Sequence, residues 1–568
     1  MDRKAPACQP TIPLTWITRA HSFRWNPARW LTGYPGPFIA GSPCSGRLPL
    51  RPSDPTPCLY PMSALVDPVQ PLLKAHRRLA SDLADLCLEV NHEVYLVGGS
   101  VRDAILGRPV RDLDLTLAAD GLALGRKLAD RLRCPFVPLD DTDRTGRVVL
   151  RRRFTIDISS FKGDSLEADL RKRDFTINAR AVRLADLLAG RPAISDPLGG
   201  KGDLAAKRLK AVSEASFRDD PLRVLRAFRL AGQFGLDITP RTQTWIAACD
   251  EDLRRVSGER LLYELSLIMG RRRTSDRVSA MIRSGVFGSL FPGWMESLSA
   301  SAKTSSATSP STSPSRRLER TDRLIARDVF LEDQGLYTHL TGYEAKMAGD
   351  RTSLWILRFA SLLLCGIRAG GAAGGTAGGA AGGTAGGADP TLDRVEGAAG
   401  GADASADSTL DRVEGAADRL RLSKRERQAL HQLVFGAVRL LEGAATREPD
   451  DEALCRILRG SKDDIPGAAL LALAHGPDEG SAAGGRIAKA ARRLLWLYAR
   501  HRSLRAKGLM LNGADIMNDL GLAEGPEVGR LLDKLETIQT IHDIRTREQA
   551  RKLLYGDAAY GLAGAESA

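Results

Sequence analysis

The stretch YLVGGSVRDAILGRPVRDLDLTL, residues 95–117, constrains the fold of this 568-residue chain more than any other. A short β-favouring run meets a Gly-Gly pair. Ser100, a good helix N-cap, then opens one or two turns of helix that Gly107 and Pro109 stop. The following DLDLTL alternates polar and apolar residues, which is the period of a half-buried strand. The pattern therefore predicts a strand, a tight turn, a short helix and a second strand.

Asp112 and Asp114 are expected on the same face of this second strand, because side chains alternate along a strand. Two adjacent carboxylates repel each other unless a cation lies between them, and oxygen-only ligands suit a hard ion such as Mg²⁺. Gly98 and Gly99 lead into a helix N-terminus, whose backbone amides can bind phosphates. We predict a metal-assisted nucleotidyl transfer site with Asp112 and Asp114 as its metal ligands. A solvated strand edge is the alternative for the two aspartates alone.

A third carboxylate for such a site comes from the run RRRFTIDISSF at residues 151–161. Phosphoryl transfer needs positioned reactants and neutralised charge, and two metals can steady the attacking and leaving oxygens. Asp157 lies between Ile156 and Ile158 in this β-like run, so we consider it the third member. The alternative is an ordinary outward-facing strand position.

The segment FRDDPLRVLRAFRL, residues 217–230, predicts the start of a long α-helical region. Arg223, Arg226 and Arg229 recur every three residues, which places them along one slowly rotating face. Asp220 and Arg223 are one helical turn apart, so they could converge on one ligand and read the edge of a nucleobase. A salt bridge between these two residues, with solvated arginines around it, is the alternative.

These motifs together resemble the class II tRNA nucleotidyltransferase and bacterial poly(A) polymerase family, whose head carries GGxVRD followed by DxD. The block DLRKRDFTINAR at 169–180 is similar to the family's RRDFTINA, with Lys172 where arginine is usual. Residues 217–230 resemble the EDxxR helix of the family, with Asp219 replacing the glutamate. The resemblance covers roughly residues 62–300 well and the rest of the chain in pieces.

The resemblance implies an α+β fold: a polymerase β-like nucleotidyltransferase α/β head followed by all-α neck, body and tail domains. It implies Mg²⁺-dependent transfer of NMP from CTP and ATP to the 3′-hydroxyl of tRNA, which adds CCA or part of it. Asp112, Asp114 and Asp157 would be catalytic, Gly99 and Arg102 would contact the triphosphate, and Asp220 with Arg223 would act as a protein template for C and A. The implied nucleotide-binding residues are Gly98, Gly99, Arg102, Arg173, Asp220, Arg223, Arg226 and Arg229.

The head alone leaves several activities open. A poly(A) polymerase acting on other RNA 3′ ends shares every catalytic motif. The stretch between Asp157 and Asp169 is short and lacks the longer flexible loop of many CCA-adding relatives, which keeps an A-only or CC-only enzyme open. A catalytically dead RNA-binding protein is the alternative of a different class, and four intact residues argue against it: Asp112, Asp114, Asp157 and Arg223.

Composition restricts the partners and the compartment of the protein. Lys and Arg outnumber Asp and Glu by 82 to 69, a formal net charge of +13, which suits a polyanion such as RNA. The eight cysteines form no CxxC pair, so neither a zinc site nor a disulfide framework is indicated. No apolar run reaches the roughly 20 residues that cross a bilayer. We expect a soluble, cytoplasmic protein without membrane contacts, and the oligomeric state stays open.

Changes in composition also predict the domain boundaries. Residues 1–61 have no clear period and are read as disordered or as a mis-called extension before Met62. In LWILRFASLLLCGIR, which resembles an HD phosphohydrolase helix, the metal-binding His and Asp positions fall on Leu364 and Cys365. The predicted segments are the extension (1–61), the head (62–209), an α-helical nucleobase-recognition and RNA-binding neck (210–297), a Ser/Thr/Pro linker (298–318), a degenerate HD-like segment (319–368), a Gly/Ala-rich insertion (369–418) and an α-helical RNA-binding body and tail (419–568).

Overall fold

The structure of the chain, a computed structural model, describes residues 69, 73, 78–110, 112–150, 154–271, 274–292, 294, 313–327, 353–365 and 400–556. All described residues belong to one compact unit, Tyr60–Ala568. The predicted extension, most of the predicted linker and the Gly/Ala-rich tract up to residue 399 lie outside the described residues.

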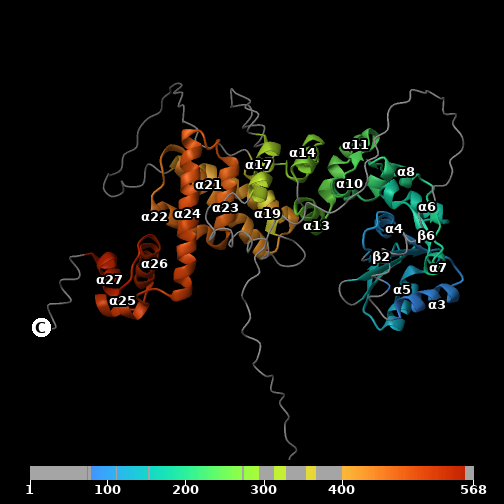
Figure 1. Ribbon diagram of the computed structural model, residues 1–568, viewed down its shortest axis with the longest axis horizontal. Coiled ribbons are helices and arrows are strands. Elements are labelled where there is room, and N and C mark those ends of the chain that lie inside the picture. Colours follow the sequence, from blue (N-terminus) through green and yellow to red (C-terminus); the bar gives the residue numbers. More distant parts are fainter. Residues whose placement is uncertain are drawn as a thin grey trace, which may run out of the picture. The chain divides into compact units, whose positions relative to one another are not determined.

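The head is built on a mixed seven-stranded sheet in the order β3-β4-β5-β2-β1-β6-β7. Figure 1 labels strands β2 and β6 of this part of the chain. Strand β2 pairs antiparallel with β1 and parallel with β5. The strands are β1 (Val94–Val97), β2 (Asp112–Leu117), β3 (Phe136–Asp140), β4 (Thr145–Val149), β5 (Thr155–Ser160), β6 (Ala181–Arg183) and β7 (Ile194–Ser195). The two central strands β2 and β5 carry the carboxylates predicted from the sequence.

The apolar core of the head determines which side chains face the active site. Helices α3 (Leu79–Glu89) and α5 (Gly121–Leu132) contribute to this core together with Leu113, Leu115 and Ile156 of the central strands. Because the strands alternate, burying these residues turns Asp112 and Asp114 to the opposite face. The short elements around the site are α4 (Gly98–Ile105), α6 (Leu166–Arg171), the 3₁₀ turn η3 (Thr176–Asn178), α7 (Leu184–Leu188), α8 (Gly200–Ala205) and β8 (Arg208–Leu209).

The predicted continuous helix across residues 217–230 is wrong in one respect. Helix α9 (Ala215–Asp219) ends before Asp220, and α10 (Arg223–Phe234) begins after a short break. Pro221 has no backbone N–H and disfavours a helical residue before it, so Asp220 is extended, with φ −148° and ψ 97°. Gly235, at φ 64°, ends α10 in the left-handed conformation that glycine adopts without strain.

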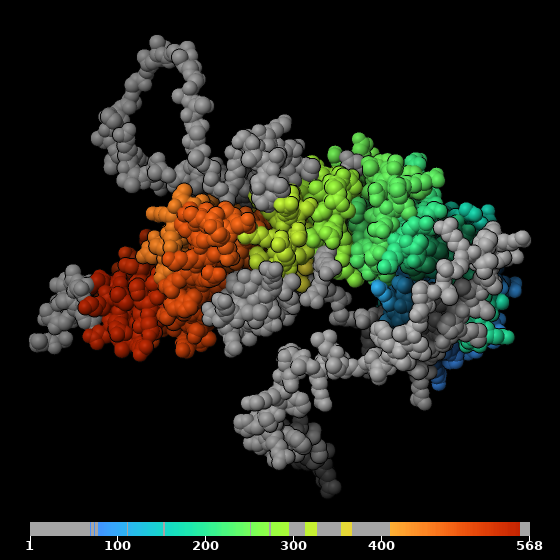
Figure 2. Space-filling view, turned by 45° about the horizontal axis from the view of Figure 1, so that its top comes forward, coloured from blue at the N-terminus to red at the C-terminus, as the bar shows by residue number. Residues whose placement is uncertain are grey.

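Apart from the two-residue strand β9, which pairs with β8, the remainder of the described chain is helical, and this confirms the predicted fold class of an α/β head followed by all-α domains. One apolar core joins helices α21–α24. A separate apolar core joins the tail helices α25–α27, which form the red part of the surface in Figure 2. The elements are β9 (Asp237–Ile238), α11 (Pro240–Ala247), α12 (Asp250–Arg255), α13 (Gly258–Met269), α14 (Ser275–Arg283), α15 (Val286–Leu290), α17 (Pro314–Arg327), α19 (Ser353–Leu363), α20 (Gly400–Leu420), α21 (Lys424–Thr446), α22 (Asp451–Ser461), α23 (Ile465–His475), α24 (Ala482–Lys507), α25 (Gly513–Leu520), α26 (Pro526–Ile541) and α27 (Arg547–Tyr555). No helix in these ranges is both long enough and apolar enough to span a bilayer.

Two predicted segments differ from the structure, and a third, the HD-like segment, shows no conflict with the prediction. The linker predicted to reach residue 318 gives way to helix α17 at Pro314, a residue that the first turn of a helix tolerates. The insertion predicted to reach residue 418 ends in helix α20, which buries Val413 and Ala417 of the second TLDRVEGAA copy. Leu364 and Cys365, at the HD-like metal positions, are fully buried, and burial raises the pKa of the Cys365 thiol to about 12.

Candidate active site

A cavity of about 290 Å³ in the head contains most of the predicted site residues. Seven of the eleven line it: Gly98, Gly99, Asp114, Asp157, Arg173, Arg223 and Arg226. The other four lie outside its lining: Arg102, Asp112, Asp220 and Arg229. The cavity therefore joins the carboxylates of the sheet, the Gly-Gly turn and the first arginines of α10.

Asp114 and Asp157 face the cavity from neighbouring strands. They occupy paired positions of the parallel strands β2 and β5. Burial, reinforced by the charge of Asp157, raises the pKa of Asp114 to about 6, and Arg173 opposes this rise. A half-buried carboxylate beside a second one is stabilised in its charged form by a cation. The pair therefore fits a hard metal ion.

Asp112 lies two residues before Asp114 on the same strand face, as predicted. It is exposed, and its Oδ1 accepts a hydrogen bond from Thr155 Oγ1 at 2.9 Å. Among the described residues, no group of three or more His, Cys, Asp or Glu side chains is arranged to hold a metal. Mg²⁺ is usually bound by one or two carboxylates together with substrate phosphates and water, so a cluster of three such side chains is not required here.

Asp157 has a partner that the sequence did not indicate. Arg147 of β4 lies opposite Asp157 of β5 in the antiparallel ladder. Its Nε donates to Asp157 Oδ1 and its Nη2 to Asp157 Oδ2, both at 2.7 Å. This pair of hydrogen bonds raises the pKa of the Arg147 guanidinium above its usual value. Strand alternation alone would have placed Arg147 on this face, but a surface arginine carries no further signal.

The Gly-Gly turn differs from the prediction in its details. Helix α4 begins at Gly98, so Ser100 lies inside the helix and is not its N-cap. Gly98 has φ +71°, and a Cβ there would lie 2.9 Å from Asp114 Oδ2, so only glycine fits this close approach. Ser100 Oγ donates to the Asp112 carbonyl at 2.8 Å and accepts from the Asp114 N–H at 3.1 Å. Ser100 thus fixes the turn against the strand that carries the carboxylates.

Arg102, expected at the triphosphate, is buried beneath the cavity. It is 7% exposed, its Nη1 donates to Asn178 Oδ1 at 2.7 Å, and it forms an ion pair with Asp103. Its guanidinium carbon lies 4.4 Å from the ring centre of Phe234 at the end of α10. The structure therefore gives Arg102 contacts that join α4 to η3 and to α10.

The three arginines of α10 have different partners. Arg223 Nη1 donates to Ser216 O at 3.0 Å, and Arg226 Nη2 lies 2.9 Å from Asp174 Oδ2 in the head. Burial opposes ionisation of Asp174, but Arg226 and hydrogen bonds outweigh it and lower the Asp174 pKa. Arg229 instead pairs with Glu264 at 2.6 Å, within the neck. The three-residue spacing predicted all three arginines along one helix face. In the structure only Arg223 and Arg226 line the cavity, and Arg229 does not.

Asp220 and Arg223 do not bond through their side chains in this structure. Asp220 pairs with Arg260, whose Nη2 lies 2.9 Å from Oδ2, and it accepts the Leu222 N–H at 3.2 Å. The Arg223 N–H donates to the Asp220 carbonyl at 3.0 Å. The alternative salt bridge between Asp220 and Arg223 is therefore absent, and their convergence on one nucleobase stays a prediction.

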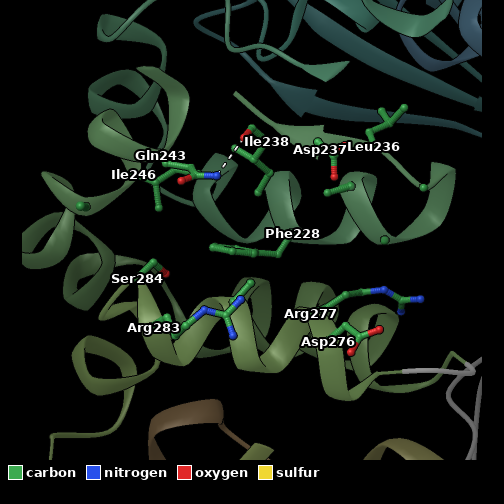
Figure 3. A pocket seen from close by; sticks show the side chains of 15 residues that line it. Phe228, Leu236, Asp237, Ile238, Gln243, Ile246, Asp276, Arg277, Arg283 and Ser284 are labelled. Carbon is green, nitrogen blue, oxygen red and sulfur yellow. Dashed lines mark hydrogen bonds between the residues drawn. The ribbon is translucent and has the colours of Figure 1, made fainter. Parts of the chain in front are cut away.

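A second cavity, of about 860 Å³, opens on the neck among α10, α11 and α14 (Figure 3). Figure 3 shows Phe228 of α10 between Gln243 of α11 and Arg283 of α14. The lining contains no predicted site residue. Helix α10 separates the two cavities, because Arg226 and Phe228 are about 200° apart around a helix of 3.6 residues per turn.

Two family models match the head and the neck. Residues 94–210 match the poly A polymerase head domain, and residues 235–298 match a domain described as a probable RNA and SrmB-binding site of polymerase A. These ranges contain the sheet with its carboxylates and the helices that follow α10.

Curated relatives and solved structures extend the similarity. The CC-adding tRNA nucleotidyltransferase of Geobacter sulfurreducens is 28% identical over 484 residues, which covers 84% of this chain and 94% of that protein. The CC-adding tRNA nucleotidyltransferase of a Synechocystis species is 34% identical over 226 residues, 39% of this chain and 52% of that protein. The apo structure of a CCA-adding enzyme aligns with a TM-score of 0.57 at 21% identity, covering 88% of this chain and 96% of that one, and so shows the shared fold.

Proposed function

Through its head and neck the chain is a member of the class II tRNA nucleotidyltransferase and bacterial poly(A) polymerase family, and we propose that it adds CCA, or part of it, to the 3′ end of tRNA from CTP and ATP. One observation carries the proposal. Asp114 and Asp157 lie side by side on parallel strands, at a cavity that also contains the Gly-Gly turn and the arginines of α10. Such a site can take a metal-bound triphosphate.

The three carboxylates would have different roles in nucleotidyl transfer. Asp112 and Asp114 would hold Mg²⁺, which supplies neutralisation of the triphosphate and a more acidic 3′-hydroxyl when bound. Asp157 would accept the proton of the attacking 3′-hydroxyl, or bind metal next to it. The raised pKa of Asp114 is the part of the structure that this assignment explains, because a bound cation relieves the repulsion between Asp114 and Asp157.

The cations of the cavity would bind the triphosphate. Arg173 lines the cavity while its Nη2 stays 2.9 Å from Asp169 Oδ2, which fixes the direction of the guanidinium. Lys172, at the position where the family has arginine, also lines the cavity. The backbone amide of Gly99, in the first turn of α4, adds a neutral donor for a phosphate oxygen.

Base selection is assigned to the junction of α9 and α10. Arg223 and Arg226 both line the cavity. Arg229 lies outside the lining and forms an ion pair with Glu264 in the neck. Asp220 must exchange Arg260 for the nucleobase before it can accept a hydrogen bond from an exocyclic amine. Cytosine and adenine both offer such an amine, whereas uracil and guanine present a carbonyl there.

A CC-adding enzyme is the second candidate, and two observations favour it. The relative that matches almost along its whole length, from Geobacter sulfurreducens, is named CC-adding. The connection between β5, which ends at Ser160, and α6, which begins at Leu166, is short, whereas many CCA-adding relatives have a longer flexible loop there.

The test is incubation of the purified protein with tRNA that ends before CCA, after C or after CC, with each NTP separately, followed by sequencing of the 3′ ends. Addition of C, C and A supports the full activity, and addition that stops after CC supports the second candidate. Long A tails would identify a poly(A) polymerase. No addition to any end, in a protein that still binds tRNA, would contradict the proposal and support the RNA-binding alternative.

A further inference from the structure

We propose that Arg147 is a positioning residue that keeps Asp157 from binding a divalent cation until a nucleotide enters the site. The inference rests on the proposed function, because it concerns the same metal-bound triphosphate. It adds a role for a residue outside the motifs that define the head.

The geometry of the sheet carries the inference. Arg147, Asp157 and Asp114 lie at paired positions of three adjacent strands, β4, β5 and β2. Arg147 binds both carboxylate oxygens of Asp157, each at 2.7 Å. The Arg147 side chain is 41% exposed and that of Asp157 is 24% exposed, so both can move without opening the core.

The physical reason is competition between cations. A guanidinium and a divalent ion on one carboxylate repel each other, and partial burial weakens the screening of this repulsion by water. Without nucleotide, the guanidinium is already in place, so Asp157 contributes little to metal binding. A triphosphate brings several negative charges, and these can pair with the guanidinium and leave Asp157 to the metal. The pair would therefore couple metal binding to nucleotide binding.

The experiment measures Mn²⁺ binding to the full-length, nucleotide-free protein by electron paramagnetic resonance, with wild type, Arg147→Gln and the control Arg183→Gln. Arg183 is a matched control because it lies on β6 of the same sheet, is 47% exposed and pairs with Glu93 at 3.1 Å. We expect Arg147→Gln to bind Mn²⁺ about threefold to tenfold more tightly than wild type, given the modest worth of a half-exposed ion pair and the loss of one nearby positive charge. Arg183→Gln should match wild type. Saturating CTP without tRNA should reduce the difference between Arg147→Gln and wild type.

Two further variants make the result specific. In an Asp157→Asn background the Arg147→Gln change should no longer tighten Mn²⁺ binding, because the carboxylate that it releases is absent. Arg147→Lys retains the positive charge but cannot form both hydrogen bonds to Asp157, so we expect it to tighten Mn²⁺ binding less than Arg147→Gln does. If Arg147→Gln does not fold, the Mn²⁺ affinity of Arg147→Lys tests the inference instead. Unchanged or weaker Mn²⁺ affinity in Arg147→Gln, or equal tightening without Asp157, would overturn the inference. Failure of the proposed function is distinguished separately, because it would appear as absent CTP incorporation by wild type.

Discussion

At the scale of single residues, Asp114 carries a charge that the fold disfavours. Its pKa of about 6 lies above the ordinary aspartate value of 3.8, so the folded protein retains a proton there that the unfolded chain releases. Between these two pH values the folded state binds more protons, and the free energy of unfolding therefore falls as pH rises. The loss of stability caused by ionising Asp114 is therefore complete above about pH 6.

Asp114→Asn should remove that loss of stability. In urea titrations with EDTA, we expect the variant to be more stable than wild type at pH 7.5, on the order of 1–3 kcal/mol, and the difference to shrink at pH 4.5. Mg²⁺ should narrow the gap at pH 7.5, because it binds only the wild-type carboxylate. Asp112→Asn, which removes an exposed carboxylate from the same strand, is the control. An Asp114→Asn variant that is no more stable at pH 7.5 would contradict the electrostatic account.

Asp220 allows a test of base selection. If it accepts the exocyclic amine of cytosine or adenine, Asp220→Ala should relax discrimination against UTP and GTP about ten- to hundredfold, because a buried mismatch costs about 1–3 kcal/mol. Arg223→Ala should lower both rate and selectivity, because it also removes a positive charge from the cavity. The measurement is kcat/KM for the four nucleotides on matched tRNA ends. Unchanged ratios in Asp220→Ala would leave Asp220 with only its pairing to Arg260.

Sequence patterns predicted the carboxylates better than the arginines. Alternation along a strand is a local property, so it placed Asp112 and Asp114 on one face without knowledge of the rest of the fold. A long cationic side chain chooses its partner by tertiary distance instead. Arg102 reaches Asn178, and Arg229 reaches Glu264, 35 residues along the chain. No local period contains that information.

At the scale of elements, helix α8 packs closely against the turn η3, which contributes Asn178 to the lining of the cavity. A Cβ at Gly200 would lie 2.0 Å from the Thr176 carbonyl oxygen. The turn η3 includes Asn178, whose Nδ2 donates to Asp174 Oδ1 at 3.0 Å, and Asp174 in turn holds Arg226 of α10. Displacing η3 would therefore disturb the junction of head and neck.

Gly200→Ala should destabilise the protein by about 1–3 kcal/mol, the usual cost of overpacking, and should lower kcat. Gly202→Ala is a control on the same helix, where a Cβ meets nothing within 4 Å. It should leave activity unchanged and stabilise the helix slightly, because alanine favours helix over glycine. Urea titration and nucleotide incorporation check both variants. Equal effects from the two substitutions would show that helix propensity, and not contact with η3, decides.

The sequence predicted the end of a helix correctly where a single residue determines the local backbone conformation. It did not predict a boundary that depends on packing against distant helices. Gly107 and Gly235 end α4 and α10 through conformations that glycine adopts readily. The break before α10 was predictable from Pro221, but the arginine spacing suggested one continuous helix. Helix α20 forms in a segment of low complexity because Val413 and Ala417 pack into the core, which depends on distant helices.

At the scale of the whole molecule, one long helix of the described chain is strongly basic. Helix α24, Ala482–Lys507, carries eight Lys or Arg residues and no Asp or Glu, whereas residues 509–556 hold six basic and eight acidic residues. Its 26 residues span about 39 Å at 1.5 Å per residue. Trp496 is 40% exposed, with the guanidinium carbons of Arg493 and Arg500 4.2 and 4.9 Å from its ring centre. Cations beside an exposed aromatic ring suit a nucleic-acid contact.

The double substitution Arg492→Gln and Lys507→Gln tests whether this helix binds the tRNA. Both residues are exposed, and we expect KM for tRNA to rise about threefold to tenfold at low salt while kcat stays unchanged, because each lost phosphate contact lowers the salt-dependent part of the affinity. The difference from wild type should shrink as KCl rises, and the slope of log Kd against log salt should fall by about one to two. Arg530→Gln, an exposed arginine in the acidic tail, is the control and should change KM little. A fall in kcat without a change in tRNA affinity, or an equal effect from Arg530→Gln, would show that the charge density of α24 does not direct binding.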